Sequence, residues 1–246
     1  MGPLAAPPAP ATRRQLAEEV LVVLSLSLLA SAAGAILSLF EAPIAGVTIA
    51  AAPQSPLFGR QLLGFVFGLA PVFLVVHLMR RSGEGVGTIG LAADRPGRDL
   101  ATGAALFAVV GVAGLGLYLG AVELGVNRFV IPAPPPDHWW TYPVVFMHAL
   151  EAALVEEIIV LGYLVTRLQQ MGASDRAAVG TSALLRGGYH LYQGWGGFAG
   201  NLLMGLLFGW LFVRTRRTWP FVVAHFLLDV AAAIGWLLFR EHLPGF

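Results

Sequence analysis

The chain has 246 residues, of which 57% are hydrophobic and only 12% are charged. An average soluble domain is about 45–50% apolar and about 25% charged, so this composition excludes an ordinary soluble protein, which needs a polar surface. The net charge of +1 gives no basic surface for nucleic acid, and the absence of cysteine excludes disulfides and thiol chemistry. Lipid is therefore the expected solvent.

Apolar runs of about 20 residues, long enough to cross a bilayer core of about 30 Å, recur along the chain. We predict an all-α, polytopic transmembrane helical bundle of about seven spans, at 18–40, 61–80, 100–122, 142–168, 176–193, 197–214 and 219–239. The fifth span is the weakest, because Arg186, His190 and three glycines interrupt it. Residues 1–15 are expected to form a disordered Pro/Ala-rich tail, and residues 16–246 a transmembrane domain with scaffold spans at 18–122 and a chemically active half at 142–239.

Arginine placement predicts the orientation, since cytoplasmic loops of membrane proteins collect basic residues. With the N-terminus in the cytoplasm, Arg60, Arg128 and Arg240 lie outside and Arg186 lies in the membrane. The other arginines are then cytoplasmic, at positions 13, 14, 80, 81, 95, 98, 167, 176, 214, 216 and 217. All 15 basic residues are arginine, as is typical of a GC-rich genome, and a bacterial plasma membrane is the expected location.

Ionisable side chains inside a span cost about 2.5–3.5 kcal/mol or more each and normally face a polar interior. They gather in the second half of the chain, where the spans carry His148, Glu151, Glu156, Glu157, Arg186, His190, His225 and Asp229. One such residue alone is better interpreted as an interhelical strut, but a glutamate pair, two histidines and an aspartate on three helices favour a functional site. His77, His148 and Glu151 are interpreted as structural, because no spacing partner supports them.

Spacing along the helices sharpens this prediction. Residues four apart share one helix face, which places Arg186 beside His190 on the fifth span and His225 beside Asp229 on the seventh. On the sixth span, a stripe of small residues indicates close helix packing. Its members are Gly197, Asn201, Gly205 and Gly209.

The adjacent Glu156 and Glu157 point about 100° apart on a helix and should have different roles, one at a catalytic centre and the other in a structural ion pair. Depth gives a further expectation. Counting about 1.5 Å per residue from the inner helix ends places Glu156 about 17 Å deep, His190 about 21 Å and His225 about 9 Å. Helix tilt, or span boundaries shifted by several residues, must therefore bring these side chains together.

Three known classes of intramembrane protease leave marks that this sequence lacks. No HExxH string is present for a zinc protease, and no Gly-x-Ser-x-Gly elbow for a serine protease. An aspartyl dyad needs two membrane aspartates, and Asp229 is the only aspartate within a predicted span. A site built from glutamate and histidine remains.

Three strings carry these residues: EEIIVLG at 156–162, RGGYH at 186–190 and HFLLD at 225–229. Together, over about 142–239, they resemble the motifs of the CPBP family of intramembrane proteases, which includes type II CAAX prenyl endopeptidases and bacteriocin-processing or Abi-like immunity proteins. Two positions depart from the family pattern, since Leu161 stands where the family has Arg and Arg186 where it has Phe. We hypothesise that Arg186 supplies the missing cation by pairing with Glu157.

The resemblance implies an endopeptidase that hydrolyses a peptide bond of a membrane-anchored or lipidated substrate. Glu156 and His190 would activate a water, and His225 and Asp229 would stabilise the oxyanion. Asp229 would either donate directly in its protonated form or orient His225 through the ring N–H. Zinc or another divalent metal on Glu156, His190 and His225 is the rival mechanism.

Two other functions stay open at this point. The same buried side chains could serve a proton-coupled transporter, although the sequence shows no inverted repeat. The departures at Leu161 and Arg186 also allow a catalytically silent immunity or scaffold protein of the same fold. The substrate is equally open between prenylated peptides, bacteriocin leaders, signal-peptide remnants and regulatory membrane proteins.

Overall fold

The computed structural model describes residues 11–40, 48–49, 57–128, 130–131 and 138–239. In this part of the chain the only strands are the short parallel pair β1 (Thr48–Ile49) and β2 (Val130–Ile131), so the predicted all-α class is confirmed. The α-helices are α1 (Arg13–Ser25), α2 (Leu29–Leu37), α3 (Phe58–Gly68), α4 (Ala70–Arg81), α5 (Pro96–Glu123), α6 (Thr141–Val155), α7 (Leu164–Gln170), α8 (Asp175–Tyr189), α9 (Trp195–Thr215) and α10 (Trp219–Phe239). A π-helix, η2 (Glu156–Tyr163), joins α6 to α7, and 3-10 turns occur at η1 (Val86–Ile89) and η3 (Leu191–Gln193).

Four helical segments within the described residues are long and apolar enough to cross a membrane: α3 with α4, α5, α9 and α10. They match the predicted spans at 61–80, 100–122, 197–214 and 219–239. The first predicted span is broken instead, because α1 and α2 meet at an angle of 57°. The disordered tail predicted at 1–15 does not include residues 13–15, which are helical and follow the N-cap Thr12; residues 1–10 lie outside the described part.

The two remaining predicted spans carry the charged residues and behave differently. Residues 141–170 form one uninterrupted helical run through α6, η2 and α7. By contrast, α8 has 15 residues and ends at Tyr189, a length of about 22 Å, which is short for a bilayer crossing. The α-helix thus ends four residues before the end of the predicted span at 176–193, and the 3-10 turn η3 follows it. The chain turns at Gly194, whose φ of 101° favours glycine, and enters α9.

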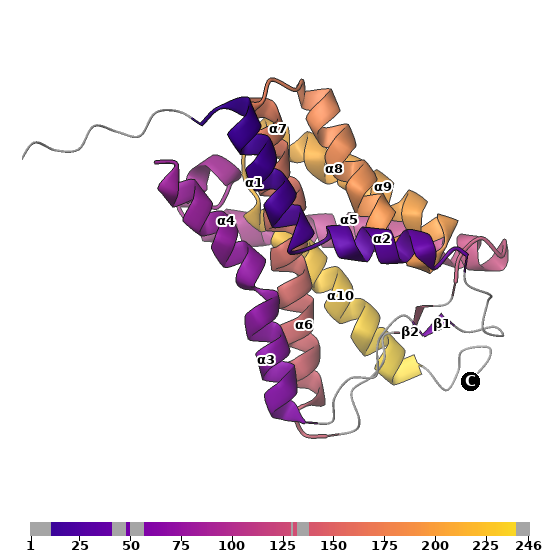
Figure 1. Ribbon diagram of the computed structural model, residues 1–246. Coiled ribbons are helices and arrows are strands. Elements are labelled where there is room, and N and C mark those ends of the chain that lie inside the picture. The colour runs from indigo at the N-terminus through magenta and orange to yellow at the C-terminus, as the bar shows by residue number, and fades with distance from the viewer. Residues whose placement is uncertain (1–10, 41–47, 50–56, 129, 132–137, 240–246) are drawn as a thin grey trace, which may run out of the picture.

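The helices cross at several angles (Figure 1). The α3–α4 pair runs beside α6, whereas α8 and α9 descend obliquely together and α10 slants away from the α6–α7 run. Extensive contacts join α8 to α9, and α10 to both α5 and α6. The close approach of α8 and α9 depends on the predicted small-residue stripe, because a Cβ at Gly205 would lie 2.9 Å from the Cα of Ala183. The helix-packing interpretation of that stripe is confirmed.

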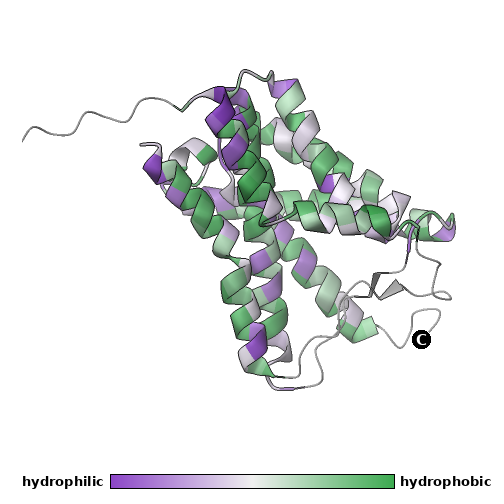
Figure 2. Ribbon diagram, viewed as in Figure 1, coloured by the Kyte–Doolittle hydropathy of each residue, from purple (hydrophilic) through white to green (hydrophobic). Residues whose placement is uncertain are grey.

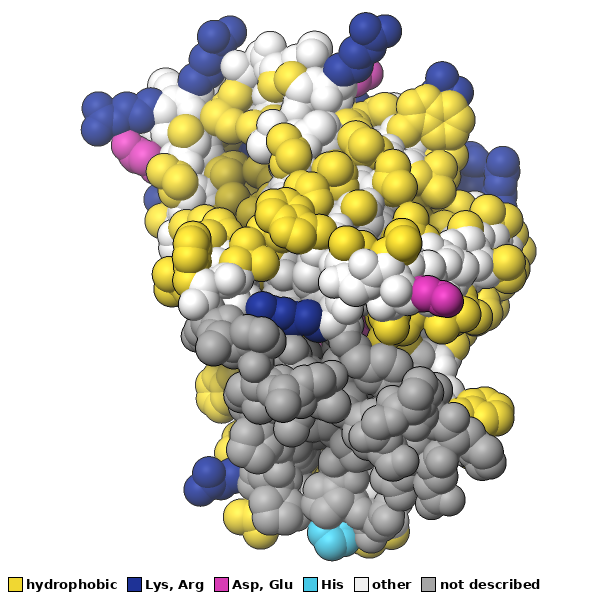
Figure 3. Space-filling model, turned by 90° about the vertical axis from the view of Figure 1, so that its right-hand side faces the viewer, with side chains coloured by type: hydrophobic (Ala, Val, Ile, Leu, Met, Phe, Trp, Pro, Cys, Tyr) yellow, Lys and Arg dark blue, Asp and Glu magenta, His cyan; other side chains and the backbone are white. Residues whose placement is uncertain are grey.

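The outside of the molecule has the character of a lipid-facing surface. Hydrophobic residues cover much of the helices in Figure 2, and large apolar side chains such as Val112 (77% exposed) and Phe67 (71% exposed) point outward. In Figure 3 apolar side chains spread widely over one face, and most of the basic side chains visible there lie above them at one end. This chain is accordingly a multi-pass membrane protein.

Ion pairs fasten the helices at the end where the arginines gather. The buried Arg167 pairs with Glu84 from the loop after α4 and with Glu19 of α1. Arg217 binds Asp99 at 2.6 Å and Asp94 at 2.7 Å, and its hydrogen bond lowers the pKa of the exposed Asp94 carboxyl below the ordinary value. These clamps tie the first half of the chain to the helices that carry the site.

Candidate active site

The π-helix η2 begins with the two glutamates, and π-helical turns occur frequently at functional sites. The Glu157 side chain has no solvent exposure, while that of Glu156 is 13% exposed. Glu157 contacts Arg186 at 2.7 Å and His225 at 2.8 Å, whereas Glu156 accepts a hydrogen bond from Tyr189, lies 3.6 Å from Arg186 and lines a cavity. The two neighbouring side chains thus have different surroundings, and their different roles stay a prediction.

Arg186 makes the predicted contact with Glu157. The Nη1 atom of Arg186 lies 2.7 Å from Oε1 of Glu157, and both side chains are buried. The guanidinium carbon lies 5.7 Å from the centre of the Phe208 ring. Leu161, which stands where the family has Arg, packs into an apolar cluster that also contains Phe208. The cation beside Glu157 thus comes from Arg186 on α8, and it lies over Phe208 of the apolar cluster that contains Leu161.

His225 lies between two carboxylates. Its Nδ1 is 2.8 Å from Oε1 of Glu157, and its Nε2 is 3.4 Å from Oδ2 of Asp229, on the predicted shared helix face. Nη2 of Arg186 also lies 3.2 Å from Nδ1, but that nitrogen cannot both accept from Arg186 and donate to Glu157. The shorter contact is with the carboxylate, and the imidazolium form of His225 donates to both acids.

His190 follows the last residue of α8 as its C-cap. Its Nδ1 lies 2.9 Å from the backbone carbonyl of Arg186, which can only accept, so Nδ1 carries the proton in that bond. In the neutral ring the lone pair then resides on Nε2, which is the atom that can accept a proton. The ring also packs against Tyr189, with ring centres 4.7 Å apart.

Tyr189 is a candidate site residue that the sequence reasoning missed. Its side chain is buried, and its hydroxyl donates to Oε2 of Glu156 at 2.8 Å. It thereby touches the carboxylate on one side and the His190 ring on the other. The sequence does show a tyrosine next to His190. The direction of the Tyr189 side chain, however, depends on where α8 ends.

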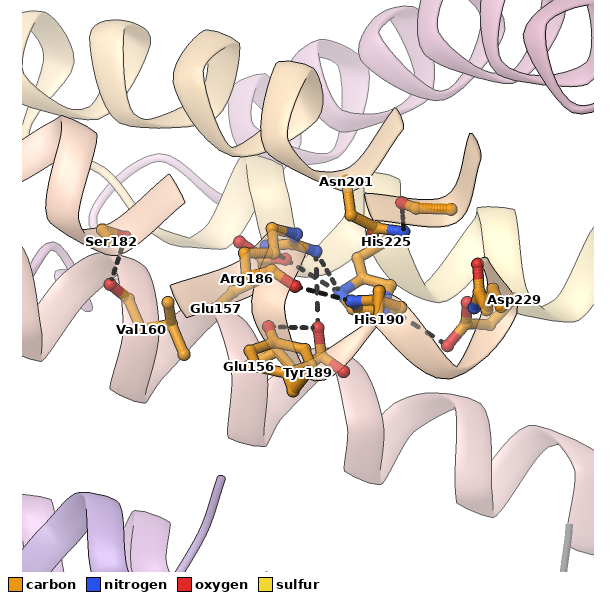
Figure 4. A network of polar contacts seen from close by, with 12 residues as sticks. Glu156, Glu157, Val160, Ser182, Arg186, Tyr189, His190, Asn201, His225 and Asp229 are labelled. Atoms are coloured by element: carbon orange, nitrogen blue, oxygen red, sulfur yellow. Dashed lines mark hydrogen bonds and ion pairs between the residues drawn. The ribbon is translucent and has the colours of Figure 1, made fainter. Parts of the chain in front are cut away.

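Side chains from η2, α8 and α10 converge on one polar network (Figure 4). The unequal depths predicted for Glu156, His190 and His225 assume that the helices are parallel and have the predicted lengths. In the structure α8 stops at Tyr189 and both α8 and α10 run obliquely to the α6–α7 run. Tilt and a shortened helix together bring the three side chains to one place.

The proposed metal ligands do not fit a metal ion as they are arranged. Both nitrogens of His225 are held by carboxylates, and the guanidinium of Arg186 lies beside that ring. Across the described residues, no group of three His, Cys, Asp or Glu side chains is placed to hold a metal. We therefore assign no step to a metal ion.

A cavity of about 710 Å³ opens beside Glu156 and extends along α6 to Glu151 and His148. Both His148 and Glu151 have a hydrogen-bond partner, contrary to the expectation from spacing. Nδ1 of His148 lies 3.2 Å from Oε2 of Glu151, and its Nε2 lies 2.9 Å from Oε1 of Gln61 on α3. A second polar cluster therefore lies at the other end of the same cavity.

Comparison with known proteins finds one family match, and it covers the region in which these residues lie. Residues 138–231 match the family model described as type II CAAX prenyl endopeptidase Rce1-like. The matched region runs from just before α6 into α10, and contains both glutamates, both histidines and Asp229. No curated protein and no solved structure matches the chain significantly.

Proposed function

Because the chain belongs over residues 138–231 to the type II CAAX prenyl endopeptidase Rce1-like family, we propose that it hydrolyses a peptide bond of a membrane-anchored substrate with a water activated by Glu156 and His190. The observation that carries the proposal is a carboxylate at the cavity together with a histidine whose second ring nitrogen is left to accept. Glu156 lines the cavity with its orientation fixed by Tyr189, and His190 keeps Nε2 available while Nδ1 is bonded to the backbone.

In the proposed reaction, Glu156 takes a proton from the water while the oxygen attacks the scissile carbonyl carbon. The resulting oxyanion needs a donor, which His225 supplies through Nε2–H. The ring stays where Glu157 holds it, and the oxyanion takes over the N–H that lies 3.4 Å from Asp229 before the reaction. A donor of this kind is worth about 2.7–4 kcal/mol. Glu156 then returns its proton to the leaving amine as the C–N bond breaks.

Glu157 and Arg186 support this chemistry without touching the reacting atoms. Arg186 holds Glu157, and Glu157 accepts from Nδ1 of His225 and fixes the ring. Asp229 acts in the proposal by orienting His225 rather than as a direct donor, since an ionised carboxylate would repel the oxyanion. The rival mechanism, a divalent metal on Glu156, His190 and His225, would need these side chains to rearrange, and it predicts that a chelator abolishes cleavage and that zinc restores it.

We also propose the full membrane topology: seven crossings, a cytoplasmic N-terminus and a bacterial plasma membrane. In this assignment 16–246 is one transmembrane domain, with scaffold helices at 18–122 and the catalytic core at 142–239. The arginine-rich ends of α1, α4 and α9 support a common cytoplasmic side. The bent α1–α2 pair and the short α8 would cross with help from the helices packed on them.

Purified protein incubated with membrane-anchored peptides tests the proposal, beside Glu156→Ala and His190→Ala. Cleavage by the unaltered protein that is lost in both variants, with one ¹⁸O incorporated from labelled water into each new carboxyl group, is expected. Uptake into vesicles that is sensitive to the same variants, without cleavage, would identify a transporter. Neither cleavage nor uptake would identify a silent scaffold or immunity protein.

A further inference from the structure

One face of α6 forms the floor of the cavity beside Glu156. The cavity is lined by α6 residues 148, 151, 152 and 155 and by Glu156 at the start of η2, which share one side of the helical run. Apolar side chains from the α1–α2 bend and from α3 and α4 form its walls, among them Leu28, Phe67 and Leu74. The cavity therefore has largely apolar walls, and two carboxylates, Glu151 and Glu156, lie on its floor.

The charges around this space do not balance. Two acids, Glu151 and Glu156, line the cavity, and among the described lining residues the only base is His148. The nearest guanidinium, that of Arg186, lies 3.6 Å from Glu156 and 2.7 Å from Glu157, which it also neutralises. An occupant with a positive charge would complete the site, whereas an anionic occupant would be repelled.

Glu151 is the carboxylate best placed to receive that charge. Its Oε2 is bonded to His148, while its Oε1 has no hydrogen-bond partner among the residues that the structure describes. The side chain reaches this position only because residue 68 is glycine, since a Cβ there would lie 1.6 Å from Oε1 of Glu151. One carboxylate oxygen is thus held in place by the protein and the other is left for a ligand.

We propose that this cavity is a specificity subsite for a lysine side chain of the substrate, with Glu151 as its acceptor. The inference rests on the proposed function, because it takes the cavity beside Glu156 as the place of the substrate. A lysine matches the space with a long apolar stem and a compact ammonium at its end. Arginine is a poorer match, because its planar fork needs both carboxylate oxygens and His148 already occupies one.

The distance along α6 sets the position of that lysine in the substrate. Glu151 and Glu156 are five residues apart, a rise of about 7.5 Å along a helix. An extended peptide advances about 3.3 Å per residue, so the lysine lies two or three residues from the scissile bond. A lysine placed farther along the substrate would miss Glu151.

The experiment uses the full-length protein in liposomes and matched membrane-anchored peptides with either lysine or norleucine at that position. Both kcat/KM and the affinity of the non-hydrolysing Glu156→Gln protein are measured. We expect about a tenfold preference for lysine, as one charged hydrogen bond provides. Glu151→Gln and Gly68→Ala should abolish the preference, the second by displacing the carboxylate. Gly64→Ala, one turn earlier on α3 with open space at its Cβ, should keep it.

Each result has a distinct meaning. Equal cleavage and equal binding of both peptides overturn the lysine subsite and leave the proposed hydrolysis standing. Binding that prefers lysine through Glu151, without cleavage by the unaltered protein, keeps the subsite and overturns the hydrolysis. If Glu151→Gln weakens both peptides alike and lowers the melting temperature, Glu151 is a structural strut between helices and the inference fails.

Discussion

Glu157 is cut off from solvent, so its charge depends on Arg186 at 2.7 Å and on His225 at 2.8 Å. Removing one partner from a buried ion pair typically costs about 3–5 kcal/mol, because the other charge stays buried and unpaired. The cation reaches Glu157 from α8, while Leu161 on η2 packs into the apolar cluster that contains Phe208. We therefore expect an arginine at position 161 to reach the same acid.

Arg186→Leu should lower the free energy of unfolding by about 3–5 kcal/mol, measured as a fall in thermal stability in detergent. The double variant Leu161→Arg/Arg186→Leu, which restores the family's arginine and removes the one on α8, should recover a large part of that loss. An Arg186→Leu protein with unchanged stability and activity would contradict the pairing. A double variant no more stable than the single one would show that the two positions are not interchangeable.

Asp229 contacts the outer nitrogen of His225 from one turn along α10, and its side chain is 40% exposed. We expect Asp229→Asn to lower kcat about tenfold or more, as the loss of an orienting partner does, with little change in KM or in melting temperature. Steady-state kinetics on one peptide measures this. Full activity in Asp229→Asn would instead favour direct donation to the oxyanion.

At the scale of the elements, the π-helix η2 is held by a close contact that only glycine permits. A Cβ at Gly162 would lie 2.7 Å from the backbone oxygen of Ile89 and 3.0 Å from Oγ1 of Thr218. Thr218 in turn donates to the same Ile89 oxygen at 2.7 Å. The loop after α4 and the start of α10 therefore both rest on η2, a few residues from the glutamates.

Gly162→Ala should destabilise the protein by about 1–3 kcal/mol through overpacking, which thermal unfolding will measure. Gly180→Ala on α8 is the matched control, since its Cβ would meet open space. Alanine has the higher helix propensity, so the control should be neutral or slightly stabilising. Equal behaviour of the two variants would rule out the contact at Gly162 as a constraint on η2.

The apolar helices were predictable because their whole signal is local. Runs of about 20 apolar residues gave α5, α9 and α10 with boundaries within a few residues. The end of α8 at Tyr189 and the 57° bend between α1 and α2 were not predictable, since packing against other helices decides both. For the same reason spacing paired His225 with Asp229 correctly but missed Tyr189, whose partner Glu156 is on another helix.

At the scale of the whole molecule, a scaffold half supports a half that carries most of the buried charge. The helices from α1 to α5 supply walls of the cavity and clamps such as the one between Glu84 and Arg167, whereas η2, α8 and α10 carry the acids and histidines of the site. Only 12% of the residues are charged. Many of the arginines among them lie near helix ends and indicate the orientation, and a small set of charged residues gathers at the site.

The orientation can be tested without removing any native residue, because the chain has no cysteine. Single cysteines at Ser82 and Thr215 should react with a membrane-impermeant maleimide only after intact cells are permeabilised. Cysteines at the exposed Leu124 and Trp139 should react without permeabilisation. The reverse pattern would place the N-terminus outside, and reaction at all four positions in intact cells would contradict the predicted spans.

In the proposed mechanism the two adjacent glutamates have different roles: Glu156 activates water, and Glu157 holds the site together. Cleavage rate and melting temperature of Glu156→Gln and Glu157→Gln, measured side by side on one membrane-anchored peptide, test it most directly. Glu156→Gln should keep the melting temperature and lose at least about 100-fold in kcat, whereas Glu157→Gln should lower the melting temperature. A Glu156→Gln protein that cleaves at the unaltered rate would contradict the account.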